Sequence, residues 1–152
     1  MAKDGSSLSN FQNVLQKHGL KEGLAFLNQR VPHRYTSVYQ LDHDHLHRLA
    51  FVDKLGSLSL DLAEVPFKDS FCELAVQGGH LVVTESATDK RMEGRPNPAM
   101  IGSYVGLPLA AAPGHLFGTL CHYDSRGWPL SDEEFEFLEE ATKVLQAYLA
   151  QT

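Results

Sequence analysis

Cysteine is scarce in this sequence, and so are long apolar runs and clusters of positive charge. Two cysteines are too few for the disulfide framework of a small secreted domain. No apolar stretch approaches the length of a membrane-spanning helix, and residues 1–10 lack the apolar segment of a secretory signal. Lysine and arginine form no run, and the formal net charge of −6 opposes binding to nucleic acid. We therefore expect a cytoplasmic protein that binds neither membranes nor nucleic acid.

The composition is that of one globular domain. The chain has 152 residues, of which 43% are apolar and 21% are charged, close to the average for soluble domains. A chain of this length buries roughly 70% of its unfolded surface, so it needs neither a metal nor a disulfide to fold. Because the first residues are small and polar, we predict that residues 1–7 are disordered and that residues 8–152 form a single domain.

Several segments carry the apolar spacing of a helix. They are residues 8–15, 20 to about 31, 71–76, and 132 to nearly the end of the chain. Gly19 follows the first helix as a C-cap, and Pro32 stops the second. Ser131 precedes the last helix and Glu134 lies three residues further on, which is the pattern of a capping box.

Other segments are β-branched, aromatic or continuously apolar, which favours strands. They are residues 35–41, 45–52, 81–84, 104–110 and 115–124. Residues 55–69 are predicted to be a loop with at most one turn of helix. Residues 86–102 form a long irregular loop, a feature that is often functional. This order predicts an α/β (α+β) fold, with a central antiparallel sheet, the terminal helices bundled on one face, and the short helix and long loop over a pocket on the other.

The second half of the chain resembles the GAF domain family. The residues that carry the resemblance are Ser103–Leu109, Gly114, Phe117–Leu120, Asp124 and Leu130–Glu134, preceded by Ser70–Cys72, Leu81–Val83 and Asp89–Arg91. The resemblance runs from about Leu24 to Leu149. It implies the same sheet and helical bundle, with a ligand pocket on the free face.

The resemblance also implies a function. Family members bind cyclic nucleotides, linear tetrapyrroles, haem, amino acids or aromatic acids, and others bind no known ligand and serve as dimerisation modules. We expect a stand-alone, non-enzymatic sensory or signalling domain that binds an unidentified small molecule and needs no cofactor. The alternatives are a cysteine-dependent redox enzyme similar to free-methionine sulfoxide reductase and a dimerisation module without a ligand.

Strand alternation assigns candidate residues to the pocket. A glycine permits close approach of a helix, so Gly118 and Leu120 are assigned to the helical side and their neighbours to the pocket. Val105, Leu107 and Leu109 form an apolar row that suits the helices. The predicted ligand-binding residues are Tyr104, Thr119, Cys121, Tyr123, Cys72 and Arg91. The alternative for the sheet residues is a collapsed pocket with an ordinary core, and for Arg91 a salt bridge with Asp89 that shapes the loop.

Two further clusters suggest chemistry. Cys72 and Cys121 are possible redox partners, and Cys72 resembles a reductase cysteine in lying before the short helix. The catalytic cysteine of those reductases lies in the long loop, and residues 86–102 contain none, which argues against that activity. His43, His45 and His47 alternate as zinc or nickel ligands would, but they flank a surface turn where polar residues are expected, so no metal site is predicted.

The last helix carries two apolar stripes. The first contains Phe135, Leu138, Leu145 and Leu149, and the second contains Phe137, Ala141, Val144 and Tyr148. A helix that packs only on its own sheet needs one stripe. The second stripe needs a partner, which is the first helix of the same chain or of a second chain. We predict a homodimer through the terminal helices.

Overall fold

The computed structural model describes residues 5–56, 64–95, 101–112 and 115–151. A six-stranded antiparallel sheet has the order β3-β2-β1-β6-β5-β4. The helices are α1 (Gly5–His18), α2 (Leu20–Asn28), α3 (Phe71–Gly78) and α4 (Asp132–Ala150), with the short 3₁₀ helices η1 (Ser86–Thr88) and η2 (Lys90–Met92). The strands are β1 (Tyr35–Asp42), β2 (His45–Asp53), β3 (Glu64–Pro66), β4 (Leu81–Val83), β5 (Ser103–Ala112) and β6 (His115–Asp124).

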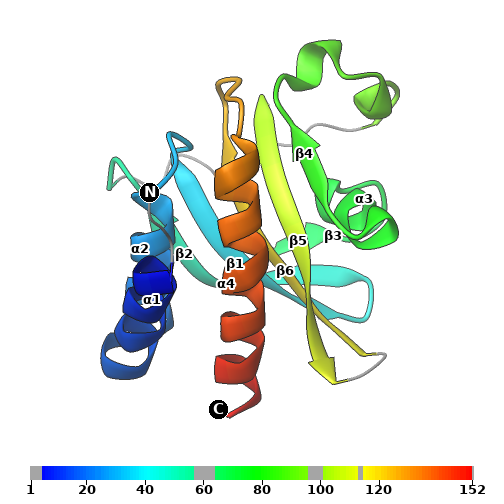
Figure 1. The fold of residues 1–152 in the computed structure, drawn as a ribbon. Coiled ribbons are helices and arrows are strands. Elements are labelled where there is room, and N and C mark those ends of the chain that lie inside the picture. Colours follow the sequence, from blue (N-terminus) through cyan, green and yellow to red (C-terminus); the bar gives the residue numbers. More distant parts are fainter. Residues whose placement is uncertain (1–4, 57–63, 96–100, 113–114, 152) are drawn as a thin grey trace.

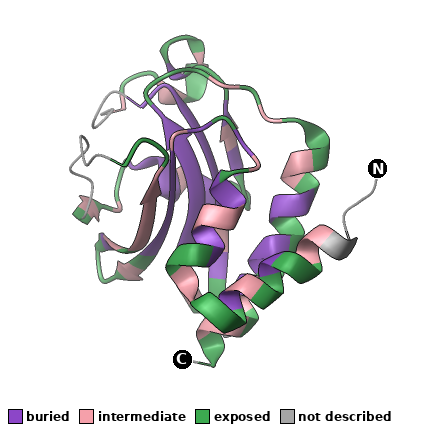
Figure 2. Ribbon diagram, turned by 90° about the vertical axis from the view of Figure 1, so that its left-hand side faces the viewer, coloured by how far each residue is buried: buried purple, intermediate pink, exposed green. Residues whose placement is uncertain are grey.

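The terminal helices cover one face of the sheet. Figure 1 shows α1, α2 and α4 grouped on one side of the sheet, with α3 lying apart from them beyond β5. Buried residues follow the contact between these helices and the strands (Figure 2). The predicted α+β arrangement is confirmed. Within the described part of the chain, no helix combines the length and hydropathy that a membrane span requires.

The core between helices and sheet uses both stripes of α4. Phe11 and Leu15 of α1 share this core with Phe137, Ala141 and Leu145 of α4. The second stripe of α4 therefore finds apolar neighbours on α1 of the same chain. The homodimer stays a prediction, and this packing removes the argument that led to it.

Capping and ion pairing fix where α4 begins. The Ser131 hydroxyl accepts a hydrogen bond from the Glu134 backbone N–H at 3.1 Å, as the capping pattern predicts. The Glu134 carboxylate accepts two hydrogen bonds from the Arg30 guanidinium, at 2.9 and 3.0 Å. The same guanidinium lies 3.6 Å from the centre of the Phe137 ring. These contacts tie the first turn of α4 to the chain that follows α2.

Some boundaries differ from the predicted ones. Residues 5–7, expected to be disordered, belong to α1, and residues 1–4 lie outside the described residues. Helix α2 ends at Asn28, earlier than the predicted stop at Pro32. The predicted loop at 55–69 contains β3, a strand too short for alternation to reveal. The strands predicted at 104–110 and 115–124 are confirmed as β5 and β6, and residues 113–114 between them, where the sequence Pro-Gly predicts a turn, fall outside the described residues.

The sheet residues divide between the helical face and the cavity face as predicted, but the role predicted for Gly118 differs from the one observed. The helical core contains Leu120 and the row of β5 residues Val105, Leu107 and Leu109, whereas Cys121 and Tyr123 belong to a second core. A Cβ on Gly118 would meet the Tyr39 carbonyl oxygen of β1. The expectation of a closely packed helix at this glycine was wrong, because the close neighbour is a strand.

Two buried histidines lie together between α2 and the sheet. Their rings stack with centroids 5.9 Å apart, and neither ring nitrogen of His33 has a hydrogen-bond partner. The Nδ1 atom of His122 lies 2.6 Å from the Thr36 hydroxyl. Burial lowers the pKa of His33 to about 4 and that of His122 to about 3. Both rings are therefore neutral at pH 7.

This pair makes stability fall in mild acid. A histidine with a lowered folded-state pKa stabilises the fold above its unfolded pKa of about 6.5, and that stability is lost as the pH falls toward the folded value. We expect each histidine to remove roughly 2 kcal/mol from the free energy of unfolding between pH 7 and pH 5. Urea unfolding at the two pH values measures the loss.

The matched comparison uses His33→Gln and His43→Gln. His33→Gln should reduce the pH-dependent loss by about half, whereas His43→Gln, on a side chain that is 90% exposed, should leave it unchanged. The same loss in all proteins would show that the buried pair is not its source.

Candidate functional site

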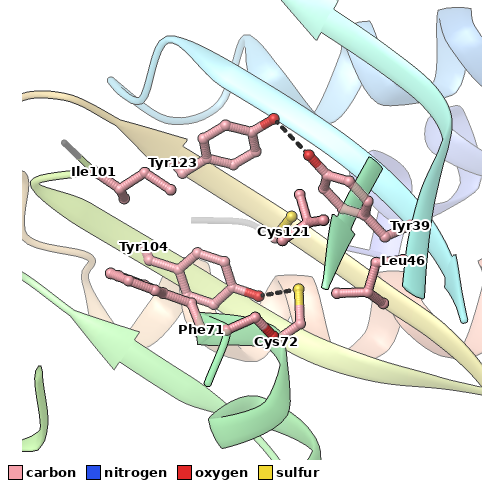
Figure 3. A pocket seen from close by; sticks show the side chains of 10 residues that line it. Tyr39, Leu46, Phe71, Cys72, Ile101, Tyr104, Cys121 and Tyr123 are labelled. Carbon is pink, nitrogen blue, oxygen red and sulfur yellow. Dashed lines mark hydrogen bonds between the residues drawn. The ribbon is translucent and has the colours of Figure 1, made fainter. Parts of the chain in front are cut away.

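A small cavity lies on the face of the sheet opposite α4. It is lined by Tyr39, Leu46, Val65, Ser70, Phe71, Cys72, Ile101, Tyr104, Cys121 and Tyr123. Its volume is about 30 Å³, space for roughly one or two water molecules. Figure 3 shows Tyr39 and Tyr123 on one side of it, Phe71 and Tyr104 on the other, and the Cys121 thiol between them. None of the lining side chains is a carboxylate, lysine or arginine.

Strand pairing aligns the residues on the floor of the cavity. Tyr104 of β5 pairs with Tyr123 of β6, so both side chains project from the same face. Gly106 pairs with Cys121 and comes two residues after Tyr104. A Cβ on Gly106 would meet the Tyr104 ring. The glycine therefore leaves the space in which this ring lies along its own strand.

Thiols and hydroxyls form hydrogen-bonded groups across this floor. The Cys72 sulfur lies 3.1 Å from the Tyr104 hydroxyl and 3.2 Å from the Thr119 hydroxyl. The Cys121 thiol lies 3.8 Å from the Ser37 carbonyl oxygen. The Tyr123 hydroxyl lies 2.9 Å from the Ser37 hydroxyl and 3.4 Å from that of Tyr39. Buried polar atoms are thus satisfied within the protein.

Burial and hydrogen bonding shift the pKa values of these groups in opposite directions. Burial raises the pKa of Tyr123 to about 12 and also raises that of Tyr104. The Cys121 pKa is raised by burial, whereas the hydrogen bond to Cys121 lowers the pKa of Cys72. The phenols are therefore neutral at pH 7, and Cys72 is the more acidic of the two thiols.

The structure brings together four of the six predicted site residues. Cys72, Tyr104, Cys121 and Tyr123 line the cavity. Thr119 is fully buried behind Cys72 and does not line it. Whether these residues bind a ligand stays a prediction.

Arg91, the sixth predicted residue, does not line the cavity. Its guanidinium pairs with the Asp89 carboxylate at 2.6 Å and donates to the Val82 carbonyl at 2.8 Å. This is the salt bridge that the sequence analysis gave as the alternative.

The missed lining residues are Tyr39, Leu46, Val65, Ser70, Phe71 and Ile101. Alternation on β1 groups Tyr35, Ser37 and Tyr39, but only the pairing of β1 with β6 places them beside Cys121 and Tyr123. The sequence carries no direct signal for that pairing.

The three histidines near the β1–β2 turn pair with carboxylates. His45 lies 2.8 Å from Asp44, and His47 lies 3.1 Å from Glu64. A search of the described residues finds no set of three or more His, Cys, Asp or Glu side chains arranged to hold a metal ion.

The long predicted loop contributes one described residue to the cavity. Ile101 is part of the lining, and its carbonyl accepts a hydrogen bond from the Ser86 hydroxyl at 2.6 Å. The Ser86 N–H also donates to the Gly102 carbonyl at 2.8 Å, so the two ends of the segment are joined. Pro96, Pro98 and Met100 fall outside the described residues, and whether the loop covers the pocket stays a prediction.

Comparison with known proteins adds sequence and structural relatives. The GAF domain model matches residues 20–148. A cyclic di-GMP phosphodiesterase of Pseudomonas aeruginosa is 36% identical over 100 residues, which cover 60% of this chain and only 16% of that protein.

Two solved structures show the same fold. A putative GAF sensor protein of Burkholderia vietnamiensis matches with a TM-score of 0.78 and 15% identity, covering 97% of this chain and 95% of the other. The free methionine-R-sulfoxide reductase of Neisseria meningitidis, solved with its substrate, matches with a TM-score of 0.73 and 19% identity, covering 97% and 92%. Identities this low support the fold and not a shared activity.

The Tyr104 side chain tests how firmly the floor is packed. It is 2% exposed, and its ring meets Phe71 with centroids 5.2 Å apart. We expect Tyr104→Ala to lower the free energy of unfolding by about 3–5 kcal/mol, because it vacates packed volume. Tyr104→Phe removes only the hydroxyl and should cost about 1 kcal/mol. Urea unfolding at pH 7 measures both. An alanine variant within about 1 kcal/mol of the parent would mean that the ring lines open space.

Proposed function

The chain belongs to the GAF domain family, and from this premise we propose that it is a sensory domain that binds a small molecule in the cavity between Tyr104 and Tyr123. The observation that carries the proposal is the cavity itself. Aromatic walls and a few hydrogen-bonding groups meet there on one face of the sheet, a composition typical of small-molecule sites. The similarity to part of a cyclic di-GMP phosphodiesterase supports a role in signal transduction. The cytoplasmic location stays a prediction.

A ligand has to displace part of the cavity's cover. Drug-sized ligands occupy about 300–1,000 Å³, far more than the cavity of about 30 Å³. Val65 belongs to β3, which has three residues and lies at the edge of the sheet. Short edge elements with few hydrogen bonds open at low cost in free energy. We infer that β3 and the start of α3 move outward, which enlarges the cavity and links binding to a change of shape.

A ligand carried through purification gives the direct test. We expect native mass spectrometry of the purified protein to show a bound small molecule that denaturation releases. Ile101→Phe places a larger side chain in the cavity wall and should abolish the adduct. Leu49→Phe is the matched control, because Leu49 is 46% exposed and does not line the cavity.

The outcomes separate the sensor from a structural module. An adduct that survives Ile101→Phe would place the ligand elsewhere. No adduct on the parent, together with no stabilisation by a broad metabolite panel in thermal unfolding, would favour a dimerisation module. Light scattering at micromolar concentration then tests the predicted homodimer.

A cysteine-dependent reductase is the second candidate. The observation that favours it is the lowered pKa of Cys72, which lines the cavity together with Cys121. A thiol with a lowered pKa is the usual nucleophile of cysteine redox chemistry. Both thiols are buried, however, and residues 86–102 contain no cysteine. These two facts favour the sensor.

An activity assay decides between these candidates. We expect no consumption of free methionine sulfoxide in the presence of dithiothreitol. If methionine sulfoxide is consumed by the parent and by His43→Gln but not by Cys72→Ser, the protein is a reductase and the proposal of a sensory domain is contradicted.

A further inference from the structure

Arg48 lies on β2 beside the cavity. It is directly opposite Tyr39 and two residues after Leu46, and both of these residues line the cavity. The β1–β2 register shifts between Val38 and Tyr39, which leaves Leu49 without a partner on β1. Arg48 shares the cavity's face of the sheet with Leu46 by regular alternation, and the bulge brings Phe51 onto the same face. Its guanidinium carbon lies 3.9 Å from the centre of the Phe51 ring.

The Arg48 guanidinium has no acidic partner among the described residues. Its Nη1 atom is buried and makes no hydrogen bond. Four other arginines each pair with a carboxylate, namely Arg30, Arg34, Arg91 and Arg95, and the sixth arginine, Arg126, is exposed. An arginine cannot shed its charge, so a partly buried and unpaired guanidinium destabilises the fold.

We propose that Arg48 binds the anionic group of the ligand, and that the ligand is a small organic carboxylate with a flat apolar body. The inference rests on the proposed sensory function and names the ligand class for the same site. A carboxylate matches the planar fork of a guanidinium. The cavity lining itself contains no lysine or arginine, so a single negative charge fits this site better than a phosphate dianion does. The rings of Tyr39, Tyr104 and Tyr123 are apolar surfaces for the body of the ligand.

The position of Arg48 explains how such a ligand gains its affinity. Burial raises the pKa of the Tyr123 phenol, and the positive charge of Arg48 partly opposes that rise. The guanidinium is therefore near the wall that the ligand would contact. A carboxylate there pairs a charge that the protein leaves uncompensated, and it does so in surroundings of low dielectric.

Matched acids and amides test the inference. The probes are benzoate with benzamide and butyrate with butyramide, measured by isothermal titration calorimetry at pH 7. On the parent protein, each acid should bind about 10- to 100-fold more tightly than its amide. Arg48→Met should abolish this preference, and Arg48→Lys should retain part of it. Arg126→Met is the control, because Arg126 also stacks on an aromatic ring, that of Trp128, but is exposed, whereas Arg48 is partly buried.

A stability measurement separates binding from a structural role. Without ligand, Arg48→Met should unfold at the same temperature as the parent or about 2–4 °C higher, because it removes an unpaired charge and keeps an apolar contact with Phe51. A lower unfolding temperature combined with unchanged preference for acids would make Arg48 a purely structural residue and overturn the proposal.

The remaining outcomes distinguish this inference from the proposed function. If the amides bind as tightly as the acids, both in the parent and in Arg48→Met, the cavity still binds small molecules, but the proposal that the ligand is an anion is contradicted. If neither the acids nor the amides bind, the proposal that the ligand is a small carboxylate is also contradicted. The sensory function would then be decided by the adduct seen in native mass spectrometry and by its loss in Ile101→Phe.

Discussion

The close approach of β1 to β6 at Gly118 determines how both faces of the sheet are used. A side chain at this position would collide with the Tyr39 carbonyl, so the two central strands can lie together only because the residue is glycine. Beside this contact, β2 contains the unpaired residue Leu49. A bulge reverses the alternation of side chains beyond it. Phe51 and Arg48 therefore project from the same face, which regular alternation would have prevented.

The sequence was sufficient to predict β6 and its two faces. This strand is buried on both sides, and its bounds and the division between Leu120 and Cys121 follow from hydrophobic pattern and period. The bulge has no such signal, because a single extra residue does not change the composition of a strand. Arg91 was chosen from the sequence because an arginine in a long loop can pair with a ligand carboxylate or phosphate, whereas nothing in the sequence places β2 beside the cavity. The same limit hid Tyr39, whose place in the site depends on which strand lies next to β6.

The two faces of the sheet are closed in different ways. The helical face is covered by three long helices whose apolar residues form one continuous core. The cavity is covered by short pieces from separate parts of the chain, namely β3, the first turn of α3 and Ile101. Each piece contributes little apolar area of its own, so sequence periodicity could not identify the cover. Short elements also give up few contacts when they move, so this face opens at lower cost in free energy than the helical face does.

Among the described residues, His33 on the helical face and Arg48 beside the cavity each have buried nitrogen atoms without a hydrogen-bond partner, and the two groups differ in chemistry. On the helical face, His33 has two unbonded ring nitrogens, and burial lowers its pKa so that the ring is neutral at pH 7. The neutral ring can therefore stay buried at pH 7, and it destabilises the fold only when acid protonates it. An arginine cannot be deprotonated in a protein, and the guanidinium of Arg48, whose Nη1 atom has no hydrogen-bond partner among the described residues, carries its delocalised charge beside the cavity. The cavity lining contains no carboxylate, so a carboxylate from a bound ligand would give this charge a partner that the cavity wall itself does not supply. This difference between a group that can become neutral and one that cannot is the physical basis of the proposed binding of a carboxylate at Arg48.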